Sequence, residues 1–155
     1  MVTYYGKAWL EACRDTLNSS ESHMKKARKL NGTFAFRVLD GPDGKDRAAI
    51  WRFENGKCVE VSFKCAPAPW TKLREAPLDP AWVGRFSCPY NMMAKLNKGE
   101  MSPLKALASP DYKVEGKKTQ FFKMMQGLNS WNEHNATVEC NHEFTKTDDE
   151  GTEIE

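Results

Sequence analysis

The residues in this chain that could do chemistry are few, and their spacing does not assemble a catalytic site. A cysteine nucleophile needs a nearby base, and nothing in the sequence places His134 beside Cys88 or the other central cysteines. The other histidines are His23 and His142. We therefore expect surface histidines and no catalytic residue.

Metal and nucleotide chemistry have equally little support. Cys140 and His142 form a C-x-H pair that lacks two further ligands at zinc-finger spacing. Asp40, Asp43 and Asp46 lack the residue order and the distal glutamate of a calcium loop, so a turn explains them better. Neither common phosphate-binding glycine motif is present. The sequence predicts no metal site and no cofactor.

Composition describes one globular domain. The chain has 155 residues, of which 40% are apolar and 28% are charged, as expected for one hydrophobic core. No apolar run approaches the ~20 residues that cross a bilayer, and the start lacks the basic-then-apolar order of a signal peptide. Five cysteines without a C-x-x-C pair do not suggest a disulfide framework. We predict a soluble, cytoplasmic protein.

Charge is unevenly distributed along the chain. Five of the 21 acidic residues lie in the last eight positions, which leaves 23 basic and 16 acidic side chains in residues 1–147. We predict one domain over 1–140 and an acidic tail over 141–155. The basic excess is compatible with a transient contact with an anionic membrane surface or with a phosphate-bearing ligand, but scattered lysines more often form an ordinary solvated surface. Aromatic and basic residues do not interleave, so no nucleic acid partner is expected.

Three segments in the middle of the chain alternate apolar and polar residues, which is typical of half-buried strands. They span residues 34–39, 49–53 and 59–63. Asn55-Gly56 suits a type I′ hairpin turn, because both residues tolerate positive φ. We expect Val59, Val61 and Phe63 to continue the apolar face. The other face is expected to be polar.

Apolar residues recur at helical spacing toward both ends of the chain. One helix begins near Tyr5 and a second runs to about Leu30. Ser102-Pro103 suits the start of a short helix, because proline at the first helical position loses no hydrogen bond. Near the C-terminus, one uninterrupted helix is predicted over 119–131. Between these regions, 66–81 contains four prolines and is predicted to be a long loop or a broken helix.

The most specific motif is L-N-G-T-F-A-F-R-V-L-D-G-P-D-G-K over 30–45. It resembles the first strand and turn of the sterol carrier protein type 2 family, in which a glycine precedes an F-x-F strand and a D-G-P-x-G-K turn. Residues 92–103 are similar to the family's helix that ends in a G-K-M-x-P-like segment. Residues 104–107, 112–116 and the helix from Phe121 follow in the family's order, and the recognisable match spans 31–131.

The resemblance implies an α+β fold, with a mainly antiparallel five-stranded sheet and helices covering one face. It also implies an apolar cavity that binds or transfers a lipid or fatty-acyl ligand, such as a fatty acid, acyl-CoA, sterol or phospholipid, without catalysis. Two alternatives stay open. One is an accessory or homodimeric interaction domain of a lipid-metabolising system, and the other is an enzyme acting on a hydrophobic substrate. The 66–81 stretch resembles an insertion, and no S-K-L-type peroxisomal signal ends the chain.

Ligand contacts are expected mainly from the methionine- and phenylalanine-rich helices, because a flexible thioether adapts to ligands of varied shape. The tryptophans that flank the 66–81 loop are candidates for contact with a lipid tail or a membrane interface. Ordinary core packing is the alternative for all these side chains. The predicted ligand-binding residues are Trp70, Trp82, Phe86, Met92, Met93, Leu96, Leu104, Leu107, Phe121, Phe122, Met124, Met125 and Leu128.

Overall fold

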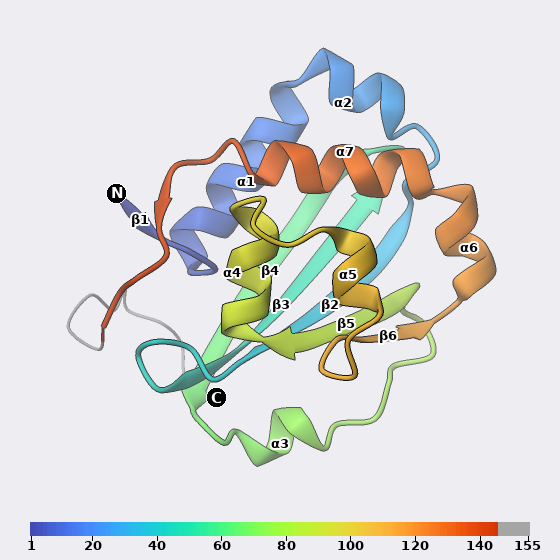
Figure 1. Cartoon of the computed structure of the whole chain (residues 1–155). Coiled ribbons are helices and arrows are strands. Elements are labelled where there is room, and N and C mark those ends of the chain that lie inside the picture. The colour runs from blue at the N-terminus through green and yellow to red at the C-terminus, as the bar shows by residue number, and fades with distance from the viewer. Residues whose placement is uncertain (146–155) are drawn as a thin grey trace.

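A five-stranded sheet runs through the centre of the fold, and most of the helices pack on one of its faces (Figure 1). The computed structural model describes residues 1–145. The sheet contains β2 (Gly32–Leu39), β3 (Lys45–Glu54), β4 (Lys57–Pro67), β5 (Gly84–Pro89) and β6 (Lys113–Gly116). The helices are α1 (Lys7–Ser19), α2 (Glu21–Lys26), α3 (Thr71–Arg74), α4 (Tyr90–Asn97), α5 (Pro103–Leu107), α6 (Lys118–Lys123) and α7 (Met125–Asn135). A separate parallel pair joins β1 (Val2–Thr3) to β7 (Cys140–Asn141).

The strand order in the sheet is β4-β3-β2-β5-β6. Neighbouring strands are antiparallel except for β2 and β5, which are parallel. The predicted α+β class is confirmed, and the sheet is mixed because of this one parallel pair. The parallel pair requires a long crossover, and the segment between β4 and β5 that contains α3 provides it.

The hairpin between β3 and β4 forms where it was predicted. Asn55 and Gly56 have φ values of 50° and 90°, as a type I′ turn requires. A register shift just before Phe53 marks a β-bulge, and Phe53 lies opposite Cys58. Cys58 is therefore the buried core residue at this end of β4, and the prediction that Val59 faces the core is wrong. The sequence pattern alone does not reveal a bulge.

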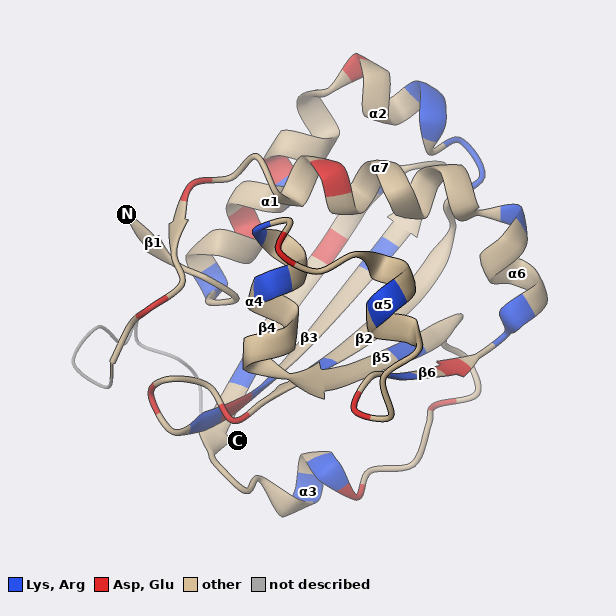
Figure 2. Ribbon diagram, in the orientation of Figure 1, with Lys and Arg blue, Asp and Glu red and all other residues tan. Residues whose placement is uncertain are grey.

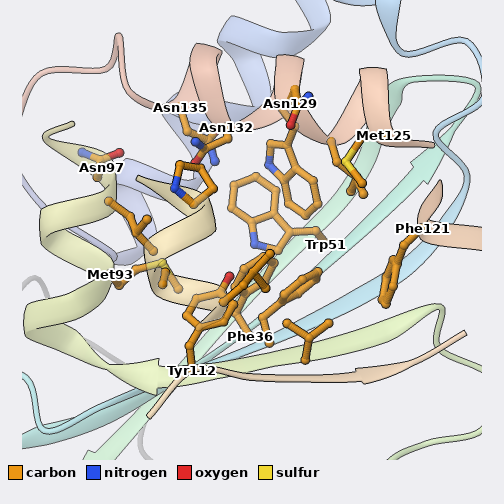
Figure 3. Close-up of a pocket in the computed structure, with 18 of the residues that line it drawn as sticks. Phe36, Trp51, Met93, Asn97, Tyr112, Phe121, Met125, Asn129, Asn132 and Asn135 are labelled. Carbon is orange, nitrogen blue, oxygen red and sulfur yellow. The ribbon is translucent and has the colours of Figure 1, made fainter. Parts of the chain in front are cut away.

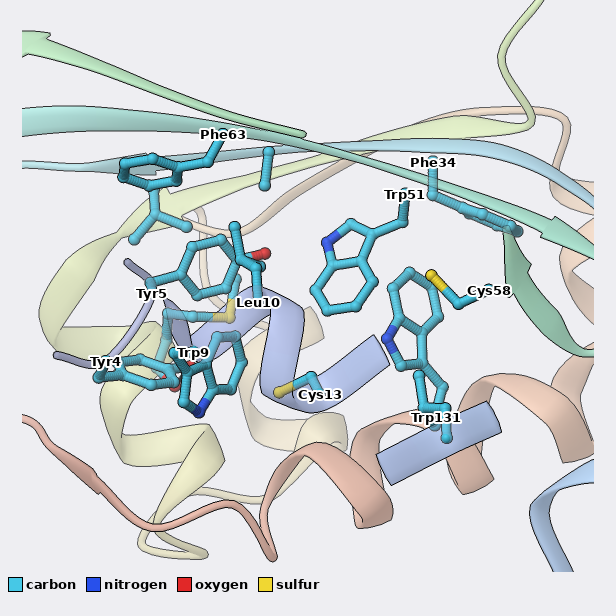
Figure 4. Packing of buried hydrophobic residues seen from close by; sticks show 14 of the residues in the cluster. Tyr4, Tyr5, Trp9, Leu10, Cys13, Phe34, Trp51, Cys58, Phe63 and Trp131 are labelled. Atoms are coloured by element: carbon cyan, nitrogen blue, oxygen red, sulfur yellow. Dashed lines mark hydrogen bonds between the residues drawn. The ribbon is translucent and has the colours of Figure 1, made fainter. Parts of the chain in front are cut away.

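Aromatic rings fill the space between the sheet and the helices (Figure 4). Trp131 of α7 lies with its ring centroid 5.1 Å from that of Trp51 and 4.7 Å from that of Phe53. Trp9 and Leu10 of α1 are buried beside them. Because α1 packs against β4 and α7, the N-terminal helix closes this core from the side.

The helix predicted over 119–131 is two helices. α6 begins at Lys118, and the chain breaks its helical geometry at Met124 before α7 starts. Side chains 121 and 131 would point about 80° apart on one straight helix. Both nevertheless contact Phe34, with ring centroids 6.5 Å and 5.4 Å away. The break allows both rings to reach the sheet.

The face of the sheet opposite the helices is not simply polar and solvated. Arg37 and Arg85 on this face are buried. Arg37 donates from Nε to Ser87 Oγ at 2.8 Å, and Arg85 Nε lies 3.0 Å from a carboxylate oxygen of Glu115. Arg37 and Arg85 also donate to backbone carbonyls of residues 73, 74 and 76, so the segment around α3 covers these arginines. The predicted loop therefore packs on the face away from α7 (Figure 1).

The chain stays packed beyond the predicted domain end at residue 140. Phe144 is buried and contacts the ring of Tyr90, whose hydroxyl donates to the carbonyl of His142 at 2.6 Å. Of the acidic tail predicted over 141–155, residues 146–155 lie outside the described residues. Among residues 1–145, no helix combines the length and apolarity needed to cross a bilayer.

Candidate functional site

A cavity of about 580 Å³ lies between the helical face of the sheet and the helices α4 to α7 (Figure 3). Most of the residues that line it are aromatic or aliphatic. They are Tyr4, Tyr5, Trp9, Phe36, Trp51, Phe86, Met93, Leu96, Asn97, Pro103, Ala106, Leu107, Tyr112, Val114, Lys118, Phe121, Phe122, Met125, Leu128, Asn129, Trp131, Asn132 and Asn135. Such a lining is typical of sites that bind apolar small molecules.

The floor of the cavity comes from three neighbouring strands. Phe36 of β2 and Phe86 of β5 are direct partners in the parallel register, and their rings stack with centroids 4.9 Å apart. Val114 of β6 pairs with Phe86 from the other side. Because alternate strand residues point to one face, these side chains form a continuous apolar surface.

Gly84 of β5 allows a ring from α6 to pack closely against the sheet. A Cβ atom at Gly84 would lie 2.3 Å from the Phe121 ring and 2.7 Å from the carbonyl oxygen of Glu115. The ring of Phe121 can therefore lie close against β5 only because residue 84 has no side chain. Phe121 is buried there, and its ring centroid lies 5.7 Å from that of Phe86.

The upper lip of the cavity is one face of α7. Met125, Leu128, Asn129, Asn132 and Asn135 recur at intervals of three and four residues, so they share a face of the helix. Figure 3 shows Asn132 and Asn135 at the end of α7 toward Asn97 of α4, with Asn129 farther along the helix toward Met125. Met125, Asn129 and Asn132 are exposed to solvent while they line the cavity, so the cavity opens along this helix. Its mouth is apolar at the Met125 end and carries amide groups at the other.

Eight of the predicted site residues lie together around the cavity. They are Phe86, Met93, Leu96, Leu107, Phe121, Phe122, Met125 and Leu128. The structure brings these side chains together from β5 and from all four helices that cover the cavity. Whether they contact a ligand stays a prediction.

The other five predicted residues do not line the cavity. Trp70 and Trp82 belong to the segment between β4 and β5, which packs on the opposite side of the sheet. Met92 packs against the core, Met124 is buried at the break between α6 and α7, and Leu104 is exposed on α5. We leave these five out of the candidate site.

Sequence reasoning missed the contribution of the N-terminus. Tyr5 packs 5.2 Å from Trp9 and 6.2 Å from Phe36, measured between ring centroids, and all three line the cavity. The strand alternation placed Phe36 and Trp51 on the apolar face but gave no sign that this face was hollow. The three asparagines of α7 carried a signal, because they share the helical spacing of Met125 and Leu128.

The cavity holds few ionisable groups. Among residues 1–145 they are Tyr4, Tyr5, Tyr112 and Lys118. Burial raises the pKa of each of these tyrosines, so their hydroxyls stay neutral. Nearby, burial raises the pKa of the Cys88 thiol to about 12, and such a thiol is a poor nucleophile near neutral pH. Residues 1–145 contain no cluster of three histidine, cysteine or carboxylate side chains able to hold a metal ion.

The prediction of surface histidines is wrong for His23, which is fully buried. Its Nε2 lies 3.0 Å from the carbonyl oxygen of Gly56, and its Nδ1 lies 2.9 Å from Ser130 Oγ. Because a carbonyl only accepts, Nε2 carries the hydrogen and Nδ1 accepts from the serine hydroxyl. Burial also lowers the pKa of His23, so the ring is a neutral link between α2, the hairpin and α7. His134 and His142 are half-buried.

Comparison with solved structures identifies the fold of this chain. No model of a known protein family and no curated protein sequence matches the chain. Among solved structures, a crystal structure of sterol carrier protein 2 aligns with a TM-score of 0.69 at 19% identity, covering 88% of this chain and 99% of that one. A conserved protein of Thermus thermophilus, described as a candidate sterol carrier protein, aligns with a TM-score of 0.69 at 18% identity over 91% of this chain and 93% of that one.

A third structure gives a weaker alignment. The sterol carrier protein domain 2 of Helicoverpa armigera aligns with a TM-score of 0.51 at 18% identity, covering 86% of this chain and 91% of that one. At these identities the likeness establishes the fold. The expectation of a sterol carrier protein 2 architecture is confirmed.

Proposed function

We propose, from the sterol carrier protein 2 fold of this chain, that it binds a lipid with a fatty-acyl chain in the cavity between sheet and helices, without catalysis. The observation that carries this proposal is the cavity itself, with about 580 Å³ of space and a predominantly apolar lining. Sites for small organic ligands commonly enclose about 300–1,000 Å³. A fatty acid, or the acyl part of a larger lipid, suits such a space.

Burial of an acyl chain supplies the affinity in this proposal. Each methylene removed from water contributes about 0.8 kcal/mol, so a long chain is held with few polar contacts. The acyl chain would lie between Phe36, Phe86 and Val114 of the sheet on one side and α7 on the other. The polar head then lies at the mouth, where Asn129 and Asn132 offer both donors and acceptors.

We also propose that the chain does not catalyse a reaction in the cavity, and the ionisable groups that line the cavity support this. General acid–base chemistry uses a group that exchanges protons near the working pH. The tyrosines of the cavity have raised pKa values and stay protonated near neutral pH. The observations favour a binding role over the enzyme alternative.

Filling the cavity tests the proposed function. Val114→Phe adds a ring to the floor beside Phe86, so we expect it to reduce the affinity for a fluorescent long-chain fatty acid by about tenfold or more. Val59→Phe is the matched control, because Val59 is half-buried and lies outside the cavity lining. The measurement is a fluorescence titration, with displacement by unlabelled fatty acid.

Two results would contradict the proposal. One is an unchanged affinity in Val114→Phe when circular dichroism shows an intact fold. The other is failure of the unmodified chain to bind the probe, together with no lipid detected by mass spectrometry after denaturation of the purified protein.

A further inference from the structure

We infer that the apolar lip of the cavity mouth docks on an anionic lipid surface, so that the mouth faces the bilayer. The lip is formed by Leu104 and Leu107 of α5, Phe122 of α6 and Met125 of α7, which we call the mouth collar. This inference rests on the proposed function, because it assigns the surface from which the ligand enters. Ligand binding in solution and membrane docking are measured separately, so a failure of one can be distinguished from a failure of the other.

Exposure of large apolar side chains is concentrated at the mouth collar. Leu104 is 79% exposed, Leu107 58%, Phe122 77% and Met125 44%. Within residues 1–145, the only other large hydrophobic side chain exposed to this extent is Met1. Single exposed apolar residues are ordinary on protein surfaces, whereas a group of them marks an interaction site.

The four side chains form one rim. Leu107, Phe122 and Met125 are exposed to solvent and also line the cavity, so all three lie where the cavity meets the surface. Leu104 lies three residues before Leu107 on α5, which places it on the same side of that helix. The collar is therefore continuous with the interior of the cavity.

Lysines lie close to the collar residues along the chain. The α5 stretch 103–107 and the α6 stretch 117–126 contain Lys105, Lys117, Lys118 and Lys123 and no acidic residue. Figure 2 shows this basic colour on α5 and α6. In the connection between the two stretches, Asp111 is exposed. Glu115, the other acid there, is paired with Arg85 on the opposite side of the sheet.

The combination of lysine and exposed apolar residues favours a membrane over a protein partner. Lysines near an anionic leaflet each contribute about 1 kcal/mol of attraction, and apolar side chains beside them enter the boundary between headgroups and acyl chains. Lysine is depleted at protein–protein interfaces. A second copy of this chain would also bring two basic collars together, which electrostatic repulsion opposes.

Flotation on vesicles tests the inference. The probe is a phosphatidylcholine vesicle in which about a third of the lipid is phosphatidylserine, compared with a pure phosphatidylcholine vesicle. The test variant is Lys105→Glu/Lys117→Glu/Lys123→Glu, which spares the cavity-lining Lys118. The matched control is Lys25→Glu/Lys26→Glu/Lys29→Glu, because these three lysines are exposed at and just after α2 and the change in net charge is the same.

We expect the unmodified chain to bind the anionic vesicles and not to bind the neutral ones. The collar triple variant should lose at least about tenfold in partition coefficient, whereas the α2 control should keep most of its binding. Leu104→Gln, at a position outside the cavity lining, should weaken flotation by several-fold. All three variants should bind fluorescent fatty acid in solution as the unmodified chain does.

Three outcomes would overturn the inference. The first is absence of flotation by the unmodified chain while fatty-acid binding is intact. The second is an equal loss in both triple variants, which would indicate unspecific attraction by net charge. The third is a dimer in light scattering that Leu104→Gln dissociates, which would make the collar an interface between copies. Loss of fatty-acid binding with intact flotation would instead count against the proposed function alone.

Discussion

The hydrogen bonds around His23 fix its protonation state. The Gly56 carbonyl can accept only from an N–H, and Ser130 can donate to the other ring nitrogen. A proton added to Nδ1 would have to displace the serine hydrogen inside a buried site. The neutral ring is therefore the form that the fold stabilises, in agreement with its lowered pKa.

Acid should destabilise the protein through His23. A lowered folded-state pKa means that the unfolded chain binds the proton first, below about pH 6.5. The stabilisation is complete above that pH and is lost as pH falls toward the folded-state pKa, by at most about 1.4 kcal/mol per pH unit. Urea unfolding at pH 7, 6 and 5 measures it, and His23→Gln should flatten the dependence.

His142 contributes in the same direction, because partial burial lowers its pKa too. His142→Gln is therefore the companion variant, and it should remove only its own share of the pH dependence. If His23→Gln kept the full pH dependence of the unmodified chain, the buried neutral ring would not be its source.

At the scale of elements, one carboxylate holds the α3 segment on the sheet. Asp46 is buried and accepts from Arg74 Nε at 2.7 Å and from the backbone N–H groups of Asp40 and Trp70. Burial alone raises the pKa of Asp46, but these hydrogen bonds outweigh it and lower the pKa. The turn after β2, the strand β3 and the α3 segment are joined at this side chain.

Asp46→Asn should destabilise the fold by about 2–4 kcal/mol, because it removes a buried charge that three groups bind. Asp15→Asn is the control, since Asp15 forms an exposed pair with Arg14 and should matter by less than about 1 kcal/mol. Urea denaturation measures both. Equal effects of the two variants would show that the Asp46 network does not anchor the segment.

Elements specified by local pattern were predictable, and those that depend on distant partners were not. The strands and the Asn55-Gly56 turn follow from alternation and turn chemistry. The burial of Arg37 depends on where the α3 segment folds, which no local period encodes. Likewise, the break at Met124 serves ring contacts with Phe34, a residue far earlier in the chain. Most apolar helix residues of the candidate site and Phe86 of β5 were therefore found, whereas its asparagines, its other strand residues and its N-terminal residues were missed.

At the scale of the whole molecule, the cavity interrupts the hydrophobic core. Trp51 and Trp131 stand at its wall, so the same rings serve the core and the candidate site. Space left inside a core forfeits packing contacts. A ligand that fills the space therefore stabilises the native state through its own binding energy.

A bound fatty acid should accordingly raise the unfolding temperature. A free ligand at a hundred times its dissociation constant adds about 2.7 kcal/mol of stability, which corresponds to several degrees for a domain of this size. Differential scanning calorimetry of delipidated protein with and without fatty acid measures the shift. Val114→Phe should show a much smaller shift, and a shift as large as that of the unmodified chain would argue that the ligand binds elsewhere.

The labelling rates of the buried thiols can measure how often the fold opens. None of the five cysteines, all within the described residues, is in a disulfide. Cys13, Cys58 and Cys88 are buried, and burial raises the pKa of each. A thiol reagent can modify them only when the fold transiently exposes them, so each labelling rate reports the opening of its own region. Labelling of Cys13 on α1, Cys58 at the hairpin and Cys88 on β5 would therefore report the opening of three separate regions of the fold.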